Sequence, residues 1–205
     1  MKIIKVIVPY LITLLALTSC DQEVKKQVNI NDLVNQREIP EPFRFHKAIE
    51  VKPGLTLDVV SWGRGSESVG AYMVLRSDST HMKYKSISGE LDGKIIDAWN
   101  MDMDSDGSPE LFIQSQGEGD GSHLNMYVYE YDDNGSTREI DFPNLSGSMK
   151  KGYKGQDSVY IKDEKLMRSF PLYAENDSTS ISTGEKRLLE YRLRKNSFSV
   201  KEIEK

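Results

Sequence analysis

From residue 43 onward, apolar and polar side chains alternate along the chain with a period of two. Leu55–Val59 alternates in this way, and so do Ala71–Arg76 and Met126–Tyr131. A period of two places every second side chain on the same face, as expected for strands with one buried face. Further strands are predicted at Lys94–Met101, Glu110–Gln114, Ser158–Lys162, Leu166–Tyr173, Arg187–Leu193 and Ser197–Ile203.

Turn signals lie between these segments. They are Pro53-Gly54, Leu91-Asp92-Gly93, Asp133-Asn134-Gly135 and Lys195-Asn196-Ser197, and Gly and Asn accept the left-handed backbone that tight hairpin turns require. No segment of helical length carries a clear apolar stripe. Short strands at this spacing predict an all-β fold, an antiparallel β-sandwich or a flattened barrel, in a single domain that covers residues 43–205.

The N-terminus has a different character. Two lysines, Lys2 and Lys5, precede an apolar run from Val6 to Leu17, which is too short to span a bilayer and is typical of a signal peptide. Leu17-Thr18-Ser19-Cys20 follows the pattern of a bacterial lipobox, and Cys20 is the only cysteine of the chain. We therefore expect residues 1–19 to be a lipoprotein signal peptide and Cys20 to be lipidated. The alternative is an ordinary signal peptide with an incidental cysteine.

Residues 20–42 are polar and end in Pro-Glu-Pro. We interpret them as the lipidated cysteine and a flexible tether, with a possible short helix at 30–36. The expected location is the bacterial cell envelope, where lipid would anchor the protein to a membrane facing the periplasm or the cell surface. With Cys20 acylated no thiol remains for a disulfide, so the domain depends on its apolar core.

The charge of the chain is mildly acidic. Its net charge is −5, and removal of residues 1–19 takes away two lysines and no acids, which leaves −7. A surface of this sign argues against nucleic acid and against peripheral binding to anionic lipid. It suits a cationic protein partner, although soluble domains without charged ligands are often mildly acidic too.

The segment 102–110 carries the first candidate chemistry. Asp102, Asp104, Asp106 and Glu110 place carboxylates at the first, third, fifth and ninth positions of a loop in which Gly107 permits a sharp turn. Ca²⁺ prefers about six to eight oxygen ligands at about 2.3–2.6 Å, and this spacing suits it. We therefore expect one structural Ca²⁺ here as the only candidate cofactor.

Two related sites are excluded and one alternative stays open. An EF-hand needs a glutamate at the twelfth position, where the chain has Ile113. A calcium-binding propeller needs the loop in every blade, and the chain contains it once. The alternative is a metal-free turn in which the aspartates accept hydrogen bonds from nearby backbone amides.

A glycine-rich segment, Gln114–His123, follows the acidic loop. It is not a phosphate-binding loop, because it is acidic and leads into a strand rather than a helix. His123 is a candidate ligand or base, but a lone histidine at the start of a strand is more often packed or solvated. The three histidines of the chain show no metal-ligand spacing, and neither a Gly-x-Ser-x-Gly elbow nor a thiol nucleophile is present. We expect no catalytic residues and no enzymatic activity. The alternative that the sequence leaves open is a glycosidase pair formed in space by scattered Asp and Glu residues.

Four segments within residues 66–200 together resemble the periplasmic inhibitors of invertebrate-type lysozyme, which are small all-β proteins of Gram-negative bacteria. Ser68–Tyr72 is similar to an early strand of that family, and Asp102–Leu111 to its Asp-rich turn with Pro-Glu. Arg168–Tyr173 and Lys186–Tyr191 are similar to its C-terminal pair of strands.

The resemblance implies a function as well as a fold. Family members inhibit lysozyme with a Ser-Gly-x-Tyr loop, which corresponds to Asp120, Gly121, Ser122 and His123 here; only the glycine is retained. The implied function is a lipid-anchored binding protein that blocks a lysozyme cleft with this loop. The alternative is a structural or accessory surface lipoprotein with one calcium-stabilised loop and no lysozyme binding.

Overall fold

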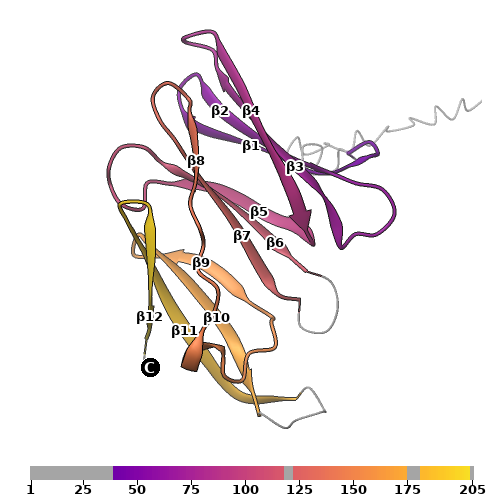
Figure 1. Cartoon of the computed structure of the whole chain (residues 1–205), viewed down its shortest axis with the longest axis vertical. Coiled ribbons are helices and arrows are strands. Elements are labelled where there is room, and N and C mark those ends of the chain that lie inside the picture. Colours follow the sequence, from indigo (N-terminus) through magenta and orange to yellow (C-terminus); the bar gives the residue numbers. More distant parts are fainter. Residues whose placement is uncertain (1–38, 118–121, 175–180, 204–205) are drawn as a thin grey trace, which may run out of the picture. The chain divides into compact units, whose positions relative to one another are not determined.

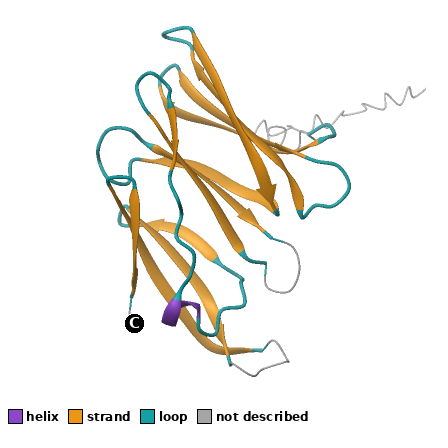
Figure 2. Ribbon diagram, in the orientation of Figure 1, coloured by secondary structure: helices purple, strands orange, loops and turns teal. Residues whose placement is uncertain are grey.

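The structure, a computed structural model, describes residues 39–117, 122–174 and 181–203. The signal peptide 1–19, Cys20, the tether up to residue 38 and the possible helix at 30–36 lie outside the described residues. Among the residues described, no helix is long and apolar enough to cross a membrane. The elements (Figures 1 and 2) are β1 (Phe43–Lys52), β2 (Leu55–Trp62), β3 (Val69–Asp78), β4 (Lys83–Asp92), β5 (Lys94–Met101), β6 (Glu110–Gln116), β7 (Leu124–Tyr131), β8 (Thr137–Glu139), η1 (Gly147–Lys150), β9 (Ser158–Lys162), β10 (Lys165–Tyr173), β11 (Ser182–Arg194) and β12 (Ser197–Glu202).

The strands form three antiparallel sheets of four strands each. Sheet A has the order β1-β2-β3-β4, sheet B the order β5-β6-β7-β8, and sheet C the order β12-β11-β10-β9. Each sheet is a meander in which strands that follow each other in sequence also pair. None of the three closes into a barrel. The all-β prediction is therefore confirmed in its sandwich form, and the flattened barrel is wrong.

Strand β6 shows why sheet B lies between the other two. Its residues from Glu110 to Ser115 are all buried, so the strand has no solvent face. Leu111 and Ile113 belong to one apolar cluster with side chains of sheet A, whereas Phe112 belongs to a second cluster with side chains of sheet C. A strand covered on both faces is apolar without alternation, and the run Leu111–Ile113 in the middle of β6 has this character.

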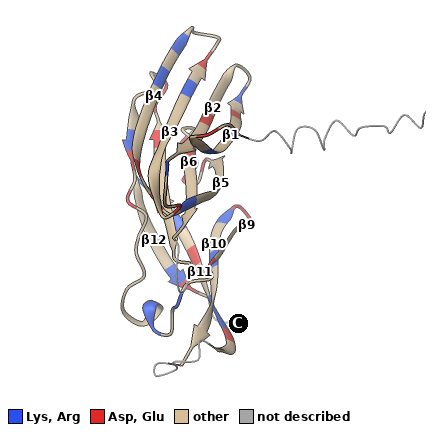
Figure 3. Cartoon of the chain, turned by 90° about the vertical axis from the view of Figure 1, so that its right-hand side faces the viewer, with Lys and Arg blue, Asp and Glu red and all other residues tan. Residues whose placement is uncertain are grey.

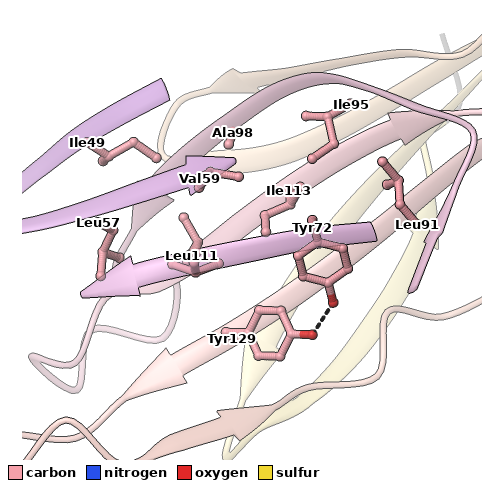
Figure 4. Close-up of a cluster of buried hydrophobic side chains, with 11 residues drawn as sticks. Ile49, Leu57, Val59, Tyr72, Leu91, Ile95, Ala98, Leu111, Ile113 and Tyr129 are labelled. Carbon is pink, nitrogen blue, oxygen red and sulfur yellow. Dashed lines mark hydrogen bonds between the residues drawn. The ribbon is translucent and has the colours of Figure 1, made fainter. Parts of the chain in front are cut away.

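The cluster between sheets A and B contains residues from β1 to β7 (Figure 4). Val59 and Val74 are fully buried within it, and the hydroxyls of Tyr72 and Tyr129 hydrogen-bond to each other across the two sheets. A buried hydroxyl without a partner is costly, so this pair satisfies both tyrosines inside an otherwise apolar layer. Full burial of an aliphatic side chain contributes roughly 1.5–3 kcal/mol, which makes this layer a main source of stability.

Gly93 connects sheet A to sheet B. It is the single residue between β4 and β5, and its φ is +79°. A Cβ at this position would lie 2.2 Å from the carbonyl oxygen of Gln116. Only glycine combines this backbone conformation with so close an approach.

Several predicted elements match the structure closely. Lys94–Met101 and Ser158–Lys162 have the predicted bounds, and each of the four turn signals falls at a junction of two consecutive strands, although Leu91, Asp92 and Ser197 are themselves strand residues. Strands β1, β4 and β8 were not predicted. β4 is a polar edge strand whose first four residues, Lys83–Ser86, are all exposed and offer little apolar pattern. Figure 3 shows that the positions of basic and acidic residues are interspersed along the strands.

Candidate metal site in the loop between β5 and β6

The acidic loop connects the end of β5 to the start of β6. The two carboxylate oxygens of Asp102 accept the backbone N–H groups of Asp106 (3.1 Å) and Gly107 (3.0 Å). Ser105 and Gly107 have φ of +59° and +89°, and these left-handed positions allow the chain to fold back over Asp102. The metal-free alternative is thus partly realised, because Asp102 organises the loop through backbone amides.

The loop also brings its three aspartates together. One carboxylate oxygen from each of Asp102, Asp104 and Asp106 lies within 4.8 Å of the other two. A separation of this size lets three oxygens contact one cation, and hard carboxylate oxygens are the ligands that Ca²⁺ prefers. The spacing of the aspartates in the sequence therefore corresponds to a real cluster in space.

Glu110 occupies a different position from the three aspartates. It is fully buried at the start of β6, and its Oε2 accepts the backbone N–H of Met103 at 2.8 Å. Its Oε1 is buried without a hydrogen-bond partner among the described residues, and the same is true of Oδ1 of Asp104. Burial raises the pKa of Glu110 to about 7, and the charges of Asp104 and Asp102 add to this effect. Glu110 therefore supports the loop and leaves one unpaired oxygen beside it.

The charges of the aspartate cluster also affect Glu130 in β7. Burial raises the pKa of Glu130, and the charges of Asp106 and Asp104 raise it further, while Arg138 opposes them. Like charges close together disfavour ionisation, and a bound cation would remove that repulsion. The loop and its neighbours thus form an electronegative site with five carboxyl groups, of which three can meet at one ion.

The predicted partner-binding loop is described only in part. Asp120 and Gly121 lie outside the described residues. Ser122 has a φ of +41°, and the carbonyl of His123 accepts the backbone N–H of Gly117 at 2.9 Å, which closes the connection between β6 and β7. His123 is exposed, and its ring meets the edge of Tyr153 with 5.3 Å between ring centroids.

A buried ion-pair network lies behind Tyr153. Arg168 donates from Nε to Oδ1 of Asp157 at 2.6 Å, with side-chain exposures of only 5 % and 3 %. The Tyr153 hydroxyl donates to Oδ2 of Asp157 (2.6 Å) and accepts from Arg168 (3.0 Å), and Arg168 also donates to Tyr191 (3.3 Å). Asp157 and Tyr191 keep the pKa of Arg168 raised despite its burial. The network fixes the aromatic ring on which His123 rests.

The sequence pattern did not lead us to expect a buried arginine in β3. Arg76 in β3 is 3 % exposed, and Nη2 donates to Oδ2 of Asp78 at 3.3 Å. Its Nε and Nη1 have no hydrogen-bond partner in the described part of the chain. It lines a cavity of about 570 Å³ between the ends of sheets A and B, and the Asp102 loop forms part of the wall. Alternation could have revealed it, because Arg76 shares the inward face of β3 with Tyr72 and Val74.

Comparisons with known proteins identify no relative. The chain matches no protein-family model, no curated protein and no solved structure. The resemblance to lysozyme inhibitors therefore stays a prediction from the quoted segments.

Proposed function

We propose that this chain is a lipid-anchored binding protein of the bacterial cell envelope, whose β-sandwich is stabilised by one Ca²⁺ in the loop 102–110. It acts by binding and carries out no catalysis. The observation on which this rests is the cluster of Asp102, Asp104 and Asp106 next to two buried oxygens without partners, Oδ1 of Asp104 and Oε1 of Glu110. Buried polar atoms in proteins almost always have a partner, and a cation held by the three aspartates would supply one to Oδ1 of Asp104.

The role of the ion would be structural. The loop is the whole connection between β5 and β6, and these strands belong to the sheet that contacts both apolar clusters. An ion that binds only the folded state stabilises it by RT ln(1 + [L]/Kd), about 2.7 kcal/mol at a hundredfold excess of ligand over Kd. For a domain of this size that corresponds to a rise in Tm of about 5–11 °C.

The test uses residues 21–205 after treatment with a chelator. Adding millimolar CaCl₂ should raise Tm by several degrees, and equilibrium dialysis should find one ion per chain. Asp104→Asn should abolish the rise, whereas Asp141→Asn, at an exposed position outside the loop, should keep it. An unchanged Tm together with no bound calcium would favour the metal-free turn.

Inhibition of a lysozyme is the second candidate function. It is favoured by the exposure of His123 at the end of the β6–β7 connection, where the network behind Tyr153 gives it a firm base. A lysozyme cleft contains catalytic carboxyl groups, one of them protonated, and a histidine donor can bond to such groups. The acidic surface of the domain suits a cationic partner.

A binding assay against i-, c- and g-type lysozymes tests this function separately from calcium binding. Truncation of a central contact residue in an interface typically costs about 2 kcal/mol or more, so His123→Ala should weaken inhibition about thirtyfold. Lys201→Ala, at an exposed position in β12, is the surface control and should have almost no effect. Asp120→Ser restores the residue of the resembled family and should improve binding if its carboxylate repels the cleft. If neither His123→Ala nor Asp120→Ser changes any affinity, the loop is not an inhibitory element.

A further inference from the structure

The cavity beside Arg76 has the size and lining of a small-molecule site. Its volume of about 570 Å³ lies within the range of about 300–1,000 Å³ that ligand pockets usually have. One wall of the cavity is apolar and includes Leu55, Leu57 and Pro109. Polar side chains line the cavity from three strands: Arg76 from β3, Asn100 from β5 and Tyr131 from β7. An apolar wall with a few convergent polar groups is the usual composition of a site for an organic ligand.

The base of the cavity carries an incompletely paired cation. The Arg76 guanidinium has five N–H donors, and its one hydrogen bond in the described structure goes to Asp78. Asp78 is itself shared, because its carboxylate also accepts the backbone N–H of His81 (3.0 Å) and contacts the His81 ring. The planar guanidinium matches a carboxylate in two parallel hydrogen bonds, so the missing partner is best supplied by a ligand carboxylate.

Tyr131 adds a second donor at the cavity. Its hydroxyl is buried and makes no hydrogen bond of good geometry, although Thr137 pairs with it across β7 and β8. Burial raises the pKa of Tyr131, so the hydroxyl keeps its proton at neutral pH and can donate to an anion. Asn100 lines the same cavity and contributes an amide.

The rim has the opposite charge from the base. Asp132 and Asp133, in the turn between β7 and β8, are exposed and line the opening. Asp132 already accepts the backbone N–H of Ser136 at 2.7 Å, whereas Asp133 has no hydrogen bond or ion pair in the described structure. A rim of this kind repels a multiply charged anion such as phosphate and attracts an ammonium group.

We propose that this cavity binds a small zwitterion of the amino-acid or dipeptide class, with its carboxylate on Arg76 and Tyr131 and its ammonium group at Asp133. Side chains of the ligand contact the apolar wall. The arrangement selects for molecules that carry both charges, because the base and the rim each lack one partner.

The turn over Arg76 sets a condition on binding. The backbone of Gly135 lies against the guanidinium, and a Cβ at this position would come within 3.1 Å of Cζ and Nη1. The turn at 132–136 therefore packs against the guanidinium, and a carboxylate that pairs with the free Nε and Nη1 has to fit beside it. Backbone amide signals of this turn should accordingly respond to the ligand.

The experiment is an NMR titration of residues 21–205 in chelator with four probes. They are L-alanyl-L-alanine, its C-terminal amide, its N-acetyl derivative and inorganic phosphate. The free dipeptide should shift the signals of Arg76, Tyr131 and the turn at 132–136. The amide should bind at least about tenfold more weakly because it cannot pair with Arg76, and the acetylated form about three- to tenfold more weakly. Phosphate should produce no comparable shift.

Three variants localise the effect. Arg76→Lys keeps the charge but loses the planar pair of donors, and it should weaken the free dipeptide about tenfold. Arg64→Lys, an exposed arginine near the opposite end of β2 with 71 % side-chain exposure, is its control and should bind normally. Asp133→Asn is at an exposed position that folding tolerates; it should weaken the free dipeptide and leave the acetylated form unchanged.

Two results would overturn the proposal. One is equal affinity for the free dipeptide and its amide, since the carboxylate would then have no role. The other is the absence of any shift at about 10 mM, a concentration that detects even binding weaker than millimolar. Calcium binding is measured separately by the dialysis experiment above, because Asp102 and Pro109 of the loop 102–110 also line this cavity.

Discussion

Removal of the Arg168 guanidinium should destabilise the fold strongly. Arg168→Met keeps much of the side-chain volume but leaves the Asp157 carboxylate at 3 % exposure without its cation. Loss of one partner of a buried ion pair typically costs about 3–5 kcal/mol, because the remaining charge stays desolvated. The Tyr153 and Tyr191 hydroxyls each lose a hydrogen bond as well. For a domain of this size, Tm should fall by about 6–20 °C.

Urea unfolding followed by tryptophan fluorescence measures this cost in stability. A double variant tests whether the cost comes from the unpaired charge of Asp157. Arg168→Met combined with Asp157→Asn removes both charges yet keeps an acceptor for Tyr153, so it should cost at least about 1 kcal/mol less than the two single variants added together. Arg64→Met is the matched control, since Arg64 pairs with Glu41 at 3.3 Å on the surface and should change stability by less than about 0.5 kcal/mol. A cost below about 1 kcal/mol for Arg168→Met, or strict additivity in the double variant, would refute the buried-charge argument.

Three further predictions concern other parts of the chain. Cys20→Ala should move the protein from the membrane fraction to the soluble extracytoplasmic fraction, and sedimentation of the variant with membranes would exclude lipidation as the anchor. Leu111→Ala, at a fully buried position, should cost about 2–5 kcal/mol in urea unfolding, whereas Val69→Ala at 62 % exposure should cost little. Hydrogen bonds from Arg192 and Lys165 lower the pKa of Glu190. The stabilisation that its carboxylate gives the fold is therefore present above the unfolded pKa of about 4.3 and is lost as pH falls. In urea titrations Glu190→Gln should lose less stability between about pH 5 and pH 3 than the unchanged protein, and identical pH profiles would contradict this.

The strands were largely predictable because their side chains report on burial. The alternation at Ala71–Arg76 and the segment Glu110–Gln114, with its apolar centre Leu111–Ile113, both correspond to real strands. β1, β4 and β8 lacked such a signal. β1 and β4 are the edges of sheet A, where charged residues protect unpaired backbone groups from other chains, and β8 has three residues.

The stacking of the sheets was less predictable. A period of two says that one face of a strand is buried, but it does not say against which sheet. Only the loss of alternation in β6 hinted at a central sheet with two covered faces. The partition of Leu111 and Phe112 into two different clusters depends on long-range contacts that no local pattern encodes.

For the candidate site, local spacing was informative and distant contacts were not. The three aspartates are near each other in sequence, and the structure brings their oxygens within 4.8 Å. Glu110 follows them closely too, yet it is fully buried and bonded to Met103, because position 110 is already part of the buried strand. The cavity at Arg76 is formed by residues far apart along the chain, and for that reason it could not be seen from spacing.

The distribution of unpaired polar atoms ties the two proposed sites to one end of the sandwich. Within the described residues, six buried side-chain atoms have no hydrogen-bond partner, and five of them belong to Arg76, Asp104, Glu110 and Tyr131. These five atoms lie at the Asp102 loop and the cavity that it borders. Because each unpaired buried group opposes folding, their concentration at one end is the observation on which both proposals depend. The sixth atom, Nε1 of Trp99, belongs to a side chain that packs against the apolar cluster between sheets B and C. The burial of apolar side chains in the two layers offsets the cost of the unpaired atoms.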